Sequence, residues 1–240
     1  MNNNVRIFIE NNIGLIEEHQ YDELYSKLSS DMRVEITGEL SAVLLSAGID
    51  CMQYLTKIPP YFLERVSKIK SVTIPNNITA IGNFAFTSCY DLESIKIGSG
   101  VQTIENSAFW NCKKLKNVTI PNNVLKLGSS VFRSCTNLEN VILGEELKWI
   151  QRSTFANCKE LKTIVLPDAI ELIDEYAFFN CSNLQQIVIG NHIRRIGDSA
   201  FDDCISLKEI IYRGSREDWN RISIDGYNKP LYDTNIIYLR

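Results

Sequence analysis

The hydrophobic positions of this chain recur every 23 residues from Ser71 onward. In each unit the second and fourth positions are apolar and mostly β-branched, beginning with Val72 and Ile74. This alternation predicts a strand with one face toward a core and one face outward. After further apolar positions come a phenylalanine, a cysteine three residues later and a leucine three residues after the cysteine. A fixed period of this length predicts a solenoid in which each unit is one coil stacked on the last.

Two columns of the repeat carry distinctive residues. The cysteines of the ladder are Cys89, Cys112, Cys135, Cys158, Cys181 and Cys204. The segment around each preceding phenylalanine is expected to be a short helix that ends at a small polar residue. The chain has no C-x-x-C pair, so we expect free, buried thiols that act as small apolar groups, with no metal site and no disulfide. The strand-end column alternates proline and glycine with a period of 46 residues, in the order Pro75, Gly98, Pro121, Gly144, Pro167 and Gly190.

The pattern divides the chain into four segments. Residues 1–47 lie outside the repeat, and their apolar spacing predicts a helical N-terminal cap of two or three helices, with a separate binding module as the alternative. Residues 48–70 keep the register as a degenerate first repeat, and residues 71–208 form six regular repeats. Residues 209–240 break the period and are expected to be a C-terminal α/β capping unit. There, Ser215 and Asp218 have the spacing of a helix start, Trp219 is expected to cover the last coil, and residues 235–239 are expected to form the last strand.

The unit pattern L-x-x-I-x-I-[PG]-x-x-[VI]-x-x-I-x-x-x-A-F-x-x-C-x-x-L resembles the leucine-rich repeat family, and within it the BspA-like bacterial subfamily. The resemblance covers about Ser71 to Lys208. It implies an α/β repeat solenoid, a right-handed coil with a parallel β-sheet on its concave side, and a role in protein binding or adhesion without enzyme activity. The column that would hold an asparagine ladder departs from the ordinary pattern, so no role is carried over to its residues, which are Asn77, Gly100, Asn123, Glu146, Ala169 and His192.

Charge and composition exclude several functions. The chain has 25 Lys and Arg against 29 Asp and Glu, a formal net charge of -4, and therefore lacks the basic surface that nucleic acids or anionic membranes require. No secretory leader and no 18-residue apolar run is visible. If Met1 is the native start, we expect a cytoplasmic protein, in agreement with free thiols; a trimmed chain could be extracellular.

The sequence contains no catalytic constellation. Its two histidines, His19 and His192, lie too far apart in the order of coils to serve one site. The cysteines stand one per coil, whereas a metal site needs several ligands that converge on one point. We therefore expect no enzyme activity, no metal and no cofactor.

The outward middle position of the strands points to a binding surface. It runs through Thr73, Lys96, Thr119, Ile142, Val165, Val188 and Ile211. The last four residues are β-branched and apolar, and at the spacing of neighbouring strands they form a stripe about 15 Å long. Contiguous exposed apolar surface usually marks an interface. Two alternatives are that such residues merely favour strands and that the C-terminal cap covers part of the stripe.

The predicted partner-binding residues on the concave sheet are accordingly Ile142, Val165, Val188 and Ile211 together with Lys96. Trp149 and Leu172, on neighbouring coils, form a weaker lateral candidate. The predicted function is a noncatalytic scaffold that recognises a protein partner through its concave sheet. Two alternatives are a surface adhesin exported by a route that the sequence does not show and a self-associating structural protein, that is, a homo-oligomer.

Overall fold

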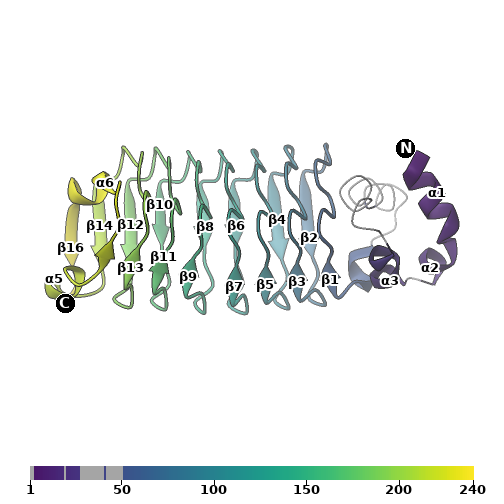
Figure 1. Cartoon of the computed structure of the whole chain (residues 1–240), viewed down its shortest axis with the longest axis horizontal. Helices are drawn as coiled ribbons and strands as arrows, with labels where there is room; N and C mark the ends of the chain where they lie inside the picture. The colour runs from purple at the N-terminus through teal and green to yellow at the C-terminus, as the bar shows by residue number, and fades with distance from the viewer. Residues whose placement is uncertain (1–2, 19, 28–40, 42–50) are drawn as a thin grey trace.

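The repeat region is a solenoid of stacked coils, as the sequence predicted (Figure 1). The structure is a computed structural model that describes residues 3–18, 20–27, 41 and 51–240. Helices near the N-terminus lie at one end of the stack and the C-terminal cap lies at the other. Each coil contributes one longer strand and one strand of two residues, and every strand pair is parallel.

The longer strands form one side of the stack. The first sheet contains β2 (Ser71–Ile74), β4 (Ser94–Ile97), β6 (Asn117–Thr119) and β8 (Asn140–Ile142), and the second contains β10 (Thr163–Val165), β12 (Gln186–Ile189), β14 (Glu209–Tyr212) and β16 (Asn235–Tyr238). The strands β8 and β10 are neighbours in the stack, so the two sheets continue one another. The inward residues of each strand, such as Val72 and Ile74, are buried. We call the outward side of these eight strands the long-strand face.

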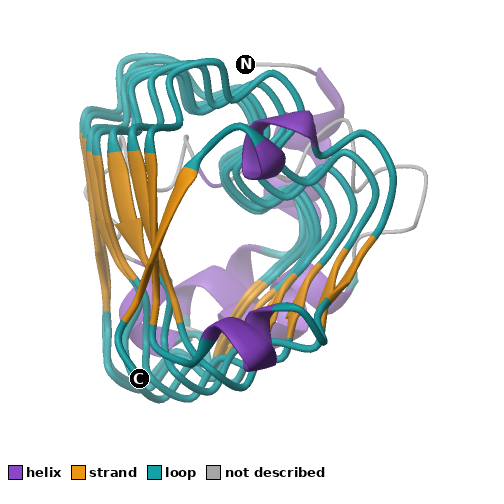
Figure 2. Ribbon diagram, turned by 90° about the vertical axis from the view of Figure 1, so that its left-hand side faces the viewer, coloured by secondary structure: helices purple, strands orange, loops and turns teal. Residues whose placement is uncertain are grey.

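The two-residue strands form a second side, separate from the long-strand face (Figure 2). They are β1 (Lys57–Ile58), β3 (Ala80–Ile81), β5 (Thr103–Ile104), β7 (Lys126–Leu127), β9 (Trp149–Ile150), β11 (Leu172–Ile173), β13 (Arg195–Ile196) and β15 (Ser223–Ile224). Their second residues point to the core, and the pairing advances by 23 residues per coil up to β13. The degenerate first repeat keeps this register, because Ile58 pairs with Ile81.

The third side is a wall of turns. The prediction of a short helical segment there is wrong. Residues Phe84 and Ser88 have positive φ angles of 56° and 58°, and the same two positions of most other coils repeat this. Between these two positions, alternate N–H groups point toward the next coil. Phe84, Phe86 and Ser88 donate to its carbonyl oxygens at 3.0, 2.7 and 2.8 Å, those of Asn106, Ala108 and Trp110. A ladder between coils thus replaces the hydrogen bonds of a helix.

The phenylalanine and cysteine columns fill the core beside this wall. The buried phenylalanine rings of successive coils are stacked with centroids 5.2–5.7 Å apart, from Phe86 to Phe201. Each ladder cysteine donates its S–H to a carbonyl oxygen of the preceding coil, as Cys112 does to Phe86 at 3.1 Å. The six contacts measure 3.0–3.2 Å. Cysteine suits this position because it is compact and apolar and still supplies a weak donor.

The proline and glycine column is explained by close approach of the backbone. A Cβ atom on Gly98 would lie 2.6 Å from the carbonyl oxygen of Pro75, and a Cβ atom on Gly144 would lie 2.4 Å from that of Pro121. Real Cβ atoms do not approach backbone so closely, so a coil that follows a proline coil needs glycine at this position.

Three helices lie at the N-terminal end: α1 (Asn3–Asn11), α2 (Ile13–Glu17) and α3 (Tyr21–Ser26), of which α3 contacts the first coil. Phe8, Ile16, Tyr21 and Leu24 are buried in the same hydrophobic cluster as the coils. The 3-10 helix η1 (Cys51–Tyr54) begins the degenerate repeat. The remainder of the predicted helical cap, residues 28–40 and 42–47, lies outside the described residues.

The C-terminal unit covers the core of the last coil at the other end of the stack. Helix α5 (Arg216–Trp219) begins at the predicted capping box, since Asp218 N–H donates to Ser215 Oγ at 3.1 Å. Trp219 is buried against Tyr212, as expected of a residue that covers the last coil. Helix α6 (Lys229–Tyr232) follows the buried Asn228. The predicted last strand is present as β16, in register beside β14.

Candidate functional site

The structure brings the four predicted apolar residues of the long-strand face into one row. Val165 pairs with Val188, and Val188 pairs with Ile211, while Ile142 stands on the neighbouring strand β8. Ile142 and Val165 are 62% and 52% exposed, whereas Val188 and Ile211 are half-buried. The C-terminal half of this row is therefore less open to a partner than the sequence suggested.

The cap extends this row rather than covering it. Ile237 on β16 pairs with Ile211 and is 37% exposed. We define the apolar stripe as Ile142, Val165, Val188, Ile211 and Ile237, which spans about 19 Å at the usual strand spacing. Sequence reasoning missed Ile237 because it lies outside the 23-residue period. The alternation expected for residues 235–239 was the signal that could have found it.

Lys96 does not belong to the apolar stripe. It stands on β4, where it pairs with Thr73, and Thr119 on β6 lies between it and Ile142. The N-terminal half of the long-strand face is thus polar, and the apolar stripe begins only at β8. Lys96 therefore lies two strands away from Ile142, where the apolar stripe begins.

A hollow of about 240 Å³ opens at the N-terminal end of the apolar stripe. Its apolar walls include Ile142, Val165 and Pro167, and its rim carries Glu145 and Arg213. The guanidinium of Arg213 forms an ion pair with Asp168, with Nη1 2.7 Å from Oδ1. The side chain of Arg213 therefore reaches back across two coils. Arg213 lines the hollow together with the exposed side chains of Ile142 and Val165. It occupies the strand-end position that is proline or glycine in the preceding coils.

The lateral candidate lies on the side formed by the two-residue strands. Trp149 on β9 pairs with Leu172 on β11, which confirms that the two residues are neighbours. Trp149 is 49% exposed and Leu172 is half-buried. Leu125, one coil earlier, is 61% exposed and was missed. Beyond Leu172 comes Arg195, whose guanidinium is paired with Asp225 at 2.6 Å, so this patch is short.

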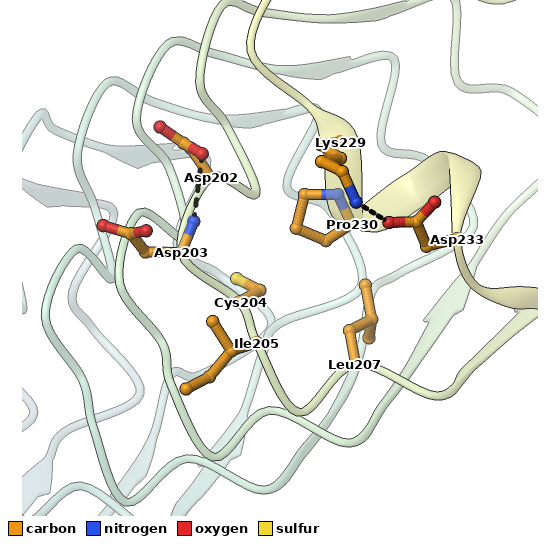
Figure 3. A pocket seen from close by; sticks show the side chains of 8 residues that line it. All are labelled: Asp202, Asp203, Cys204, Ile205, Leu207, Lys229, Pro230 and Asp233. Atoms are coloured by element: carbon orange, nitrogen blue, oxygen red, sulfur yellow. Dashed lines mark hydrogen bonds and ion pairs between the residues drawn. The ribbon is translucent and has the colours of Figure 1, made fainter.

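A second hollow, of about 310 Å³, lies where the last turn of the wall meets α6 (Figure 3). Ile205, Leu207 and Pro230 provide its apolar part, and Ile205 is 81% exposed. Cys204 also lines it, and the charged part consists of three aspartates and one lysine: Asp202, Asp203, Asp233 and Lys229. Lys229 is paired with Asp233, so the two other carboxylates leave this end of the molecule acidic.

The ladder thiols are poor nucleophiles. All six are free and buried, and burial raises the pKa of Cys89, Cys135 and Cys204 to about 12 and raises the pKa of the other three as well. A thiol reacts as its thiolate, which this environment disfavours. Their S–H groups serve instead as donors between coils.

Other titratable groups are dispersed. Nδ1 of His192 lies 2.9 Å from the carbonyl oxygen of Asp168, a contact with the preceding coil, and His19 lies outside the described residues. Asn77 and Asn123, in the same column as His192, also donate to the preceding coil. In the part of the chain that the structure describes, no three His, Cys, Asp or Glu side chains are grouped to hold a metal ion.

The repeat is identified by a family model described as BspA type leucine rich repeat region, in six copies. It matches residues 56–183 and 102–225, most of the chain. The chain belongs to the BspA-type leucine-rich repeat family. This membership agrees with the stacked coils and parallel strands, and it accounts for the residues that the resemblance covered. Members are repeat proteins, and the chain accordingly has the architecture of a repeat scaffold.

Solved structures of bacterial leucine-rich repeat proteins share the fold. A leucine-rich cell surface protein from Faecalibacterium prausnitzii is 28% identical with a TM-score of 0.56, over 72% of this chain and 55% of that protein. A leucine-rich repeat protein from T. pallidum is 27% identical with a TM-score of 0.60, over 64% and 72% respectively. The pneumococcal vaccine antigen PcpA is 25% identical with a TM-score of 0.50, over 65% and 42%. None of the curated proteins matches this BspA-type chain.

These alignments limit what can be carried over from the relatives. The BspA-type chain spans about half the length of the F. prausnitzii protein, and less than half of PcpA. Among the helices that the structure describes, none has the length and apolar character needed to cross a membrane.

Proposed function

We propose that this chain is a noncatalytic scaffold that binds a protein partner on the apolar stripe of its long-strand face. The observation that carries the proposal is the exposure of Ile142 and Val165, at 62% and 52%, beside further apolar side chains on adjacent strands. Soluble proteins rarely leave contiguous apolar rows open unless they are used. The parallel sheet holds these side chains at fixed spacing, so a partner meets a rigid surface.

The energy available from this surface is modest and depends on its best-exposed residues. Full burial of a Val or Ile side chain contributes roughly 1.5–3 kcal/mol, so the open parts of Ile142 and Val165 supply about 1–2 kcal/mol each. Affinity also requires an anchor, because association itself costs free energy. The hollow beside these two residues, with its volume of about 240 Å³, has room for one apolar side chain of the partner.

The charged rim of the hollow supplies selectivity. Arg213 is fixed by its 2.7 Å ion pair with Asp168, and Glu145 lines the same hollow. A partner that places an apolar anchor between these two groups must also match their charges. Such rim contacts affect the association rate and the choice of partner more than they affect the affinity.

The test uses charge substitutions along one column. A chain with both Val165→Lys and Val188→Lys should lose capture of its partner from native cells, because two charges would be buried in the interface. The matched control is Thr119→Lys, which adds the same group to the same column outside the apolar stripe. Circular dichroism establishes that all chains are folded. Equal recovery of the same partner by the double variant and the wild type would disprove the proposal.

Two cellular locations are compatible with the proposed function, the cytoplasm and the cell surface. The buried free thiols favour a reducing compartment, which supports a cytoplasmic scaffold. The F. prausnitzii structure is of a cell surface protein, which favours an adhesin at the surface instead. Labelling of intact cells with a membrane-impermeant reagent distinguishes these two locations. Labelled protein would support the adhesin, and protein labelled only after lysis would support the cytoplasmic scaffold.

A further inference from the structure

Among the strands that the structure describes, none pairs with the outer edge of β16, the last strand of the long-strand face. Asn235 N–H and Leu239 N–H donate to carbonyl oxygens of the preceding coil at 3.3 and 3.0 Å. Because the bonds of a parallel ladder use alternate residues, the backbone groups of Ile236 and Tyr238 point away from β14. Figure 2 views the molecule from this end, and β16 is its outermost long strand. A row of free backbone N–H and C=O groups is a template for another strand.

The sequence of β16 does nothing to prevent such pairing. Natural proteins protect open edges with lysine, proline, a bulge or a covering segment. Residues 235–239 read NIIYL and contain neither proline nor charge. At the opposite end of the solenoid, helix α3 contacts η1 of the first coil.

We propose that β16 pairs antiparallel with β16 of a second copy of this chain, across a two-fold axis that passes between the two Ile237 residues. In this register Ile236 and Tyr238 of one copy exchange backbone hydrogen bonds with Tyr238 and Ile236 of the other. The two Ile237 residues form a pair without hydrogen bonds, in which the Cα atoms are about 4.5 Å apart. An antiparallel pair of identical strands is self-complementary, as a two-fold interface requires.

The apolar stripe favours a second copy as the occupant of this edge. The two-fold axis is perpendicular to the sheet, so it leaves both long-strand faces on the same side of the dimer. The two apolar stripes then join end to end through the contact of Ile237 with its symmetry mate. Cross-strand pairs of β-branched residues stabilise a sheet, and this contact also buries a side chain that is 37% exposed in one chain alone.

The charges at the C-terminal end are compatible with this symmetry. Helices α6 and α5 lie at opposite ends of β16, and the two-fold axis exchanges these ends between copies (Figures 1 and 2). The α6 end holds three aspartates against one lysine, namely Asp202, Asp203, Asp233 and Lys229. At the α5 end, Arg213 is paired with Asp168 and Arg221 with Asp218, and Arg216 stands next to Glu217, so the charges balance. The antiparallel arrangement therefore keeps the two acidic hollows apart, and each faces an end whose charges balance.

A cysteine substitution tests both the pairing and its register. In the proposed dimer, Ile237→Cys sets two thiols opposite each other with a Cα separation of about 4.5 Å, which a disulfide can bridge. Leu239→Cys is the matched control, since it stands on the same face of β16 but is opposite Asn235 of the other copy. Under mild oxidation, Ile237→Cys should form a covalent dimer in high yield. Every chain in this test carries Cys51→Ser, so that only the buried ladder thiols remain besides the introduced one. Leu239→Cys and the chain without an introduced cysteine should then give only background.

A noncovalent measurement completes the test. Sedimentation equilibrium from about 1 to 100 µM, the range of a micromolar complex, should show a dimer for the wild type. Ile236→Pro should give a monomer, because it removes an N–H that faces the open edge and leaves the ladder to β14 intact. Should this variant fail to fold, the cysteine result decides alone. A wild type that is monomeric throughout, or equal disulfide yields from Ile237→Cys and Leu239→Cys, would overturn the proposal.

The dimer and the partner site can be separated. Val165→Lys with Val188→Lys should abolish partner capture and leave the dimer unchanged. Ile237→Glu should dissolve the dimer and leave the hollow beside Ile142 unaltered. Loss of the dimer in the double lysine variant would mean that the stripe, and not the β16 edge, holds the two copies together, and it would contradict the proposed pairing.

Discussion

Asn228 is the residue through which the C-terminal cap completes the hydrogen bonds of the last coil. In an interior coil, the N–H of the phenylalanine donates to a carbonyl oxygen of the next coil. Phe201 has no next coil, and its N–H donates to Oδ1 of Asn228 at 2.9 Å. Nδ2 of Asn228 donates to Gly197 O at 2.9 Å and to two carbonyl oxygens of the cap. The side chain is 1% exposed, so water cannot replace it.

The change Asn228→Ala should therefore destabilise the last coil. A buried N–H left without an acceptor costs about 1–3 kcal/mol, and the lost bonds of Nδ2 add about 1 kcal/mol. The carbonyl of Gly197 keeps a partner, since Ala200 N–H also donates to it, at 3.3 Å. The expected total is about 3 kcal/mol. Because coils contact only their neighbours, the loss should appear as local opening at the C-terminal end.

Native-state hydrogen exchange measures this opening residue by residue. A loss of about 3 kcal/mol corresponds to roughly 100-fold faster exchange, since each 1.4 kcal/mol is a factor of ten. The amides of Ser199 and Phe201 should accelerate by this factor, and the amide of Phe109 should not change. Asn123→Ala is the control, because Asn123 is exposed and makes one bond, to Ser99 O. Unchanged exchange at Phe201 in the Asn228 variant would refute the reasoning.

Three further predictions concern single residues. In a chain with Cys51→Ser, the ladder thiols, including Cys135 with its pKa raised to about 12 by burial, should react with a thiol reagent at pH 8 only after unfolding, and reaction in the native state would contradict their burial. Gly100→Ala should lower the unfolding midpoint in urea by more than about 1 M, because its Cβ would lie 1.9 Å from Asn76 O, whereas Gly14→Ala should not lower it. Hydrogen bonds with the capping residue Ser215 lower the pKa of Asp218. The stabilisation of the folded state by this carboxylate is therefore present at neutral pH and lost as the pH falls below about 4. Asp218→Asn should weaken the pH dependence of the unfolding free energy in that range.

The parts of the fold that repeat could be predicted from the sequence, because packing imposes a period on side chains. Val72, Ile74 and Ile81 lie in the core as their columns indicated. The wall of turns could not be predicted, because it depends on the sign of φ. Phe84 and Ser107 share a positive φ although their side chains differ, since bonds between coils hold that conformation.

The residues of the candidate site could be predicted where they follow the 23-residue period, and they could not be predicted outside it. Ile142 and Val165 were found because strand alternation fixes which side chains point outward. Ile237 was missed because the cap adds residues between β14 and β16 and so shifts the count. The contribution of Arg213 depends on Asp168, two coils away, and a side chain that reaches across coils leaves no trace in the repeat pattern.

The alternation of proline and glycine at the strand ends sets the steps in which such a molecule can grow. Gly98 and Gly144 are each required by a proline coil immediately before them, where a Cβ atom would strike the backbone. Insertion of a single proline coil next to another proline coil would remove the glycine that this contact needs. Insertion of a proline coil together with its glycine coil, 46 residues, preserves the alternation. A longer stack designed from this chain should therefore grow by pairs of coils.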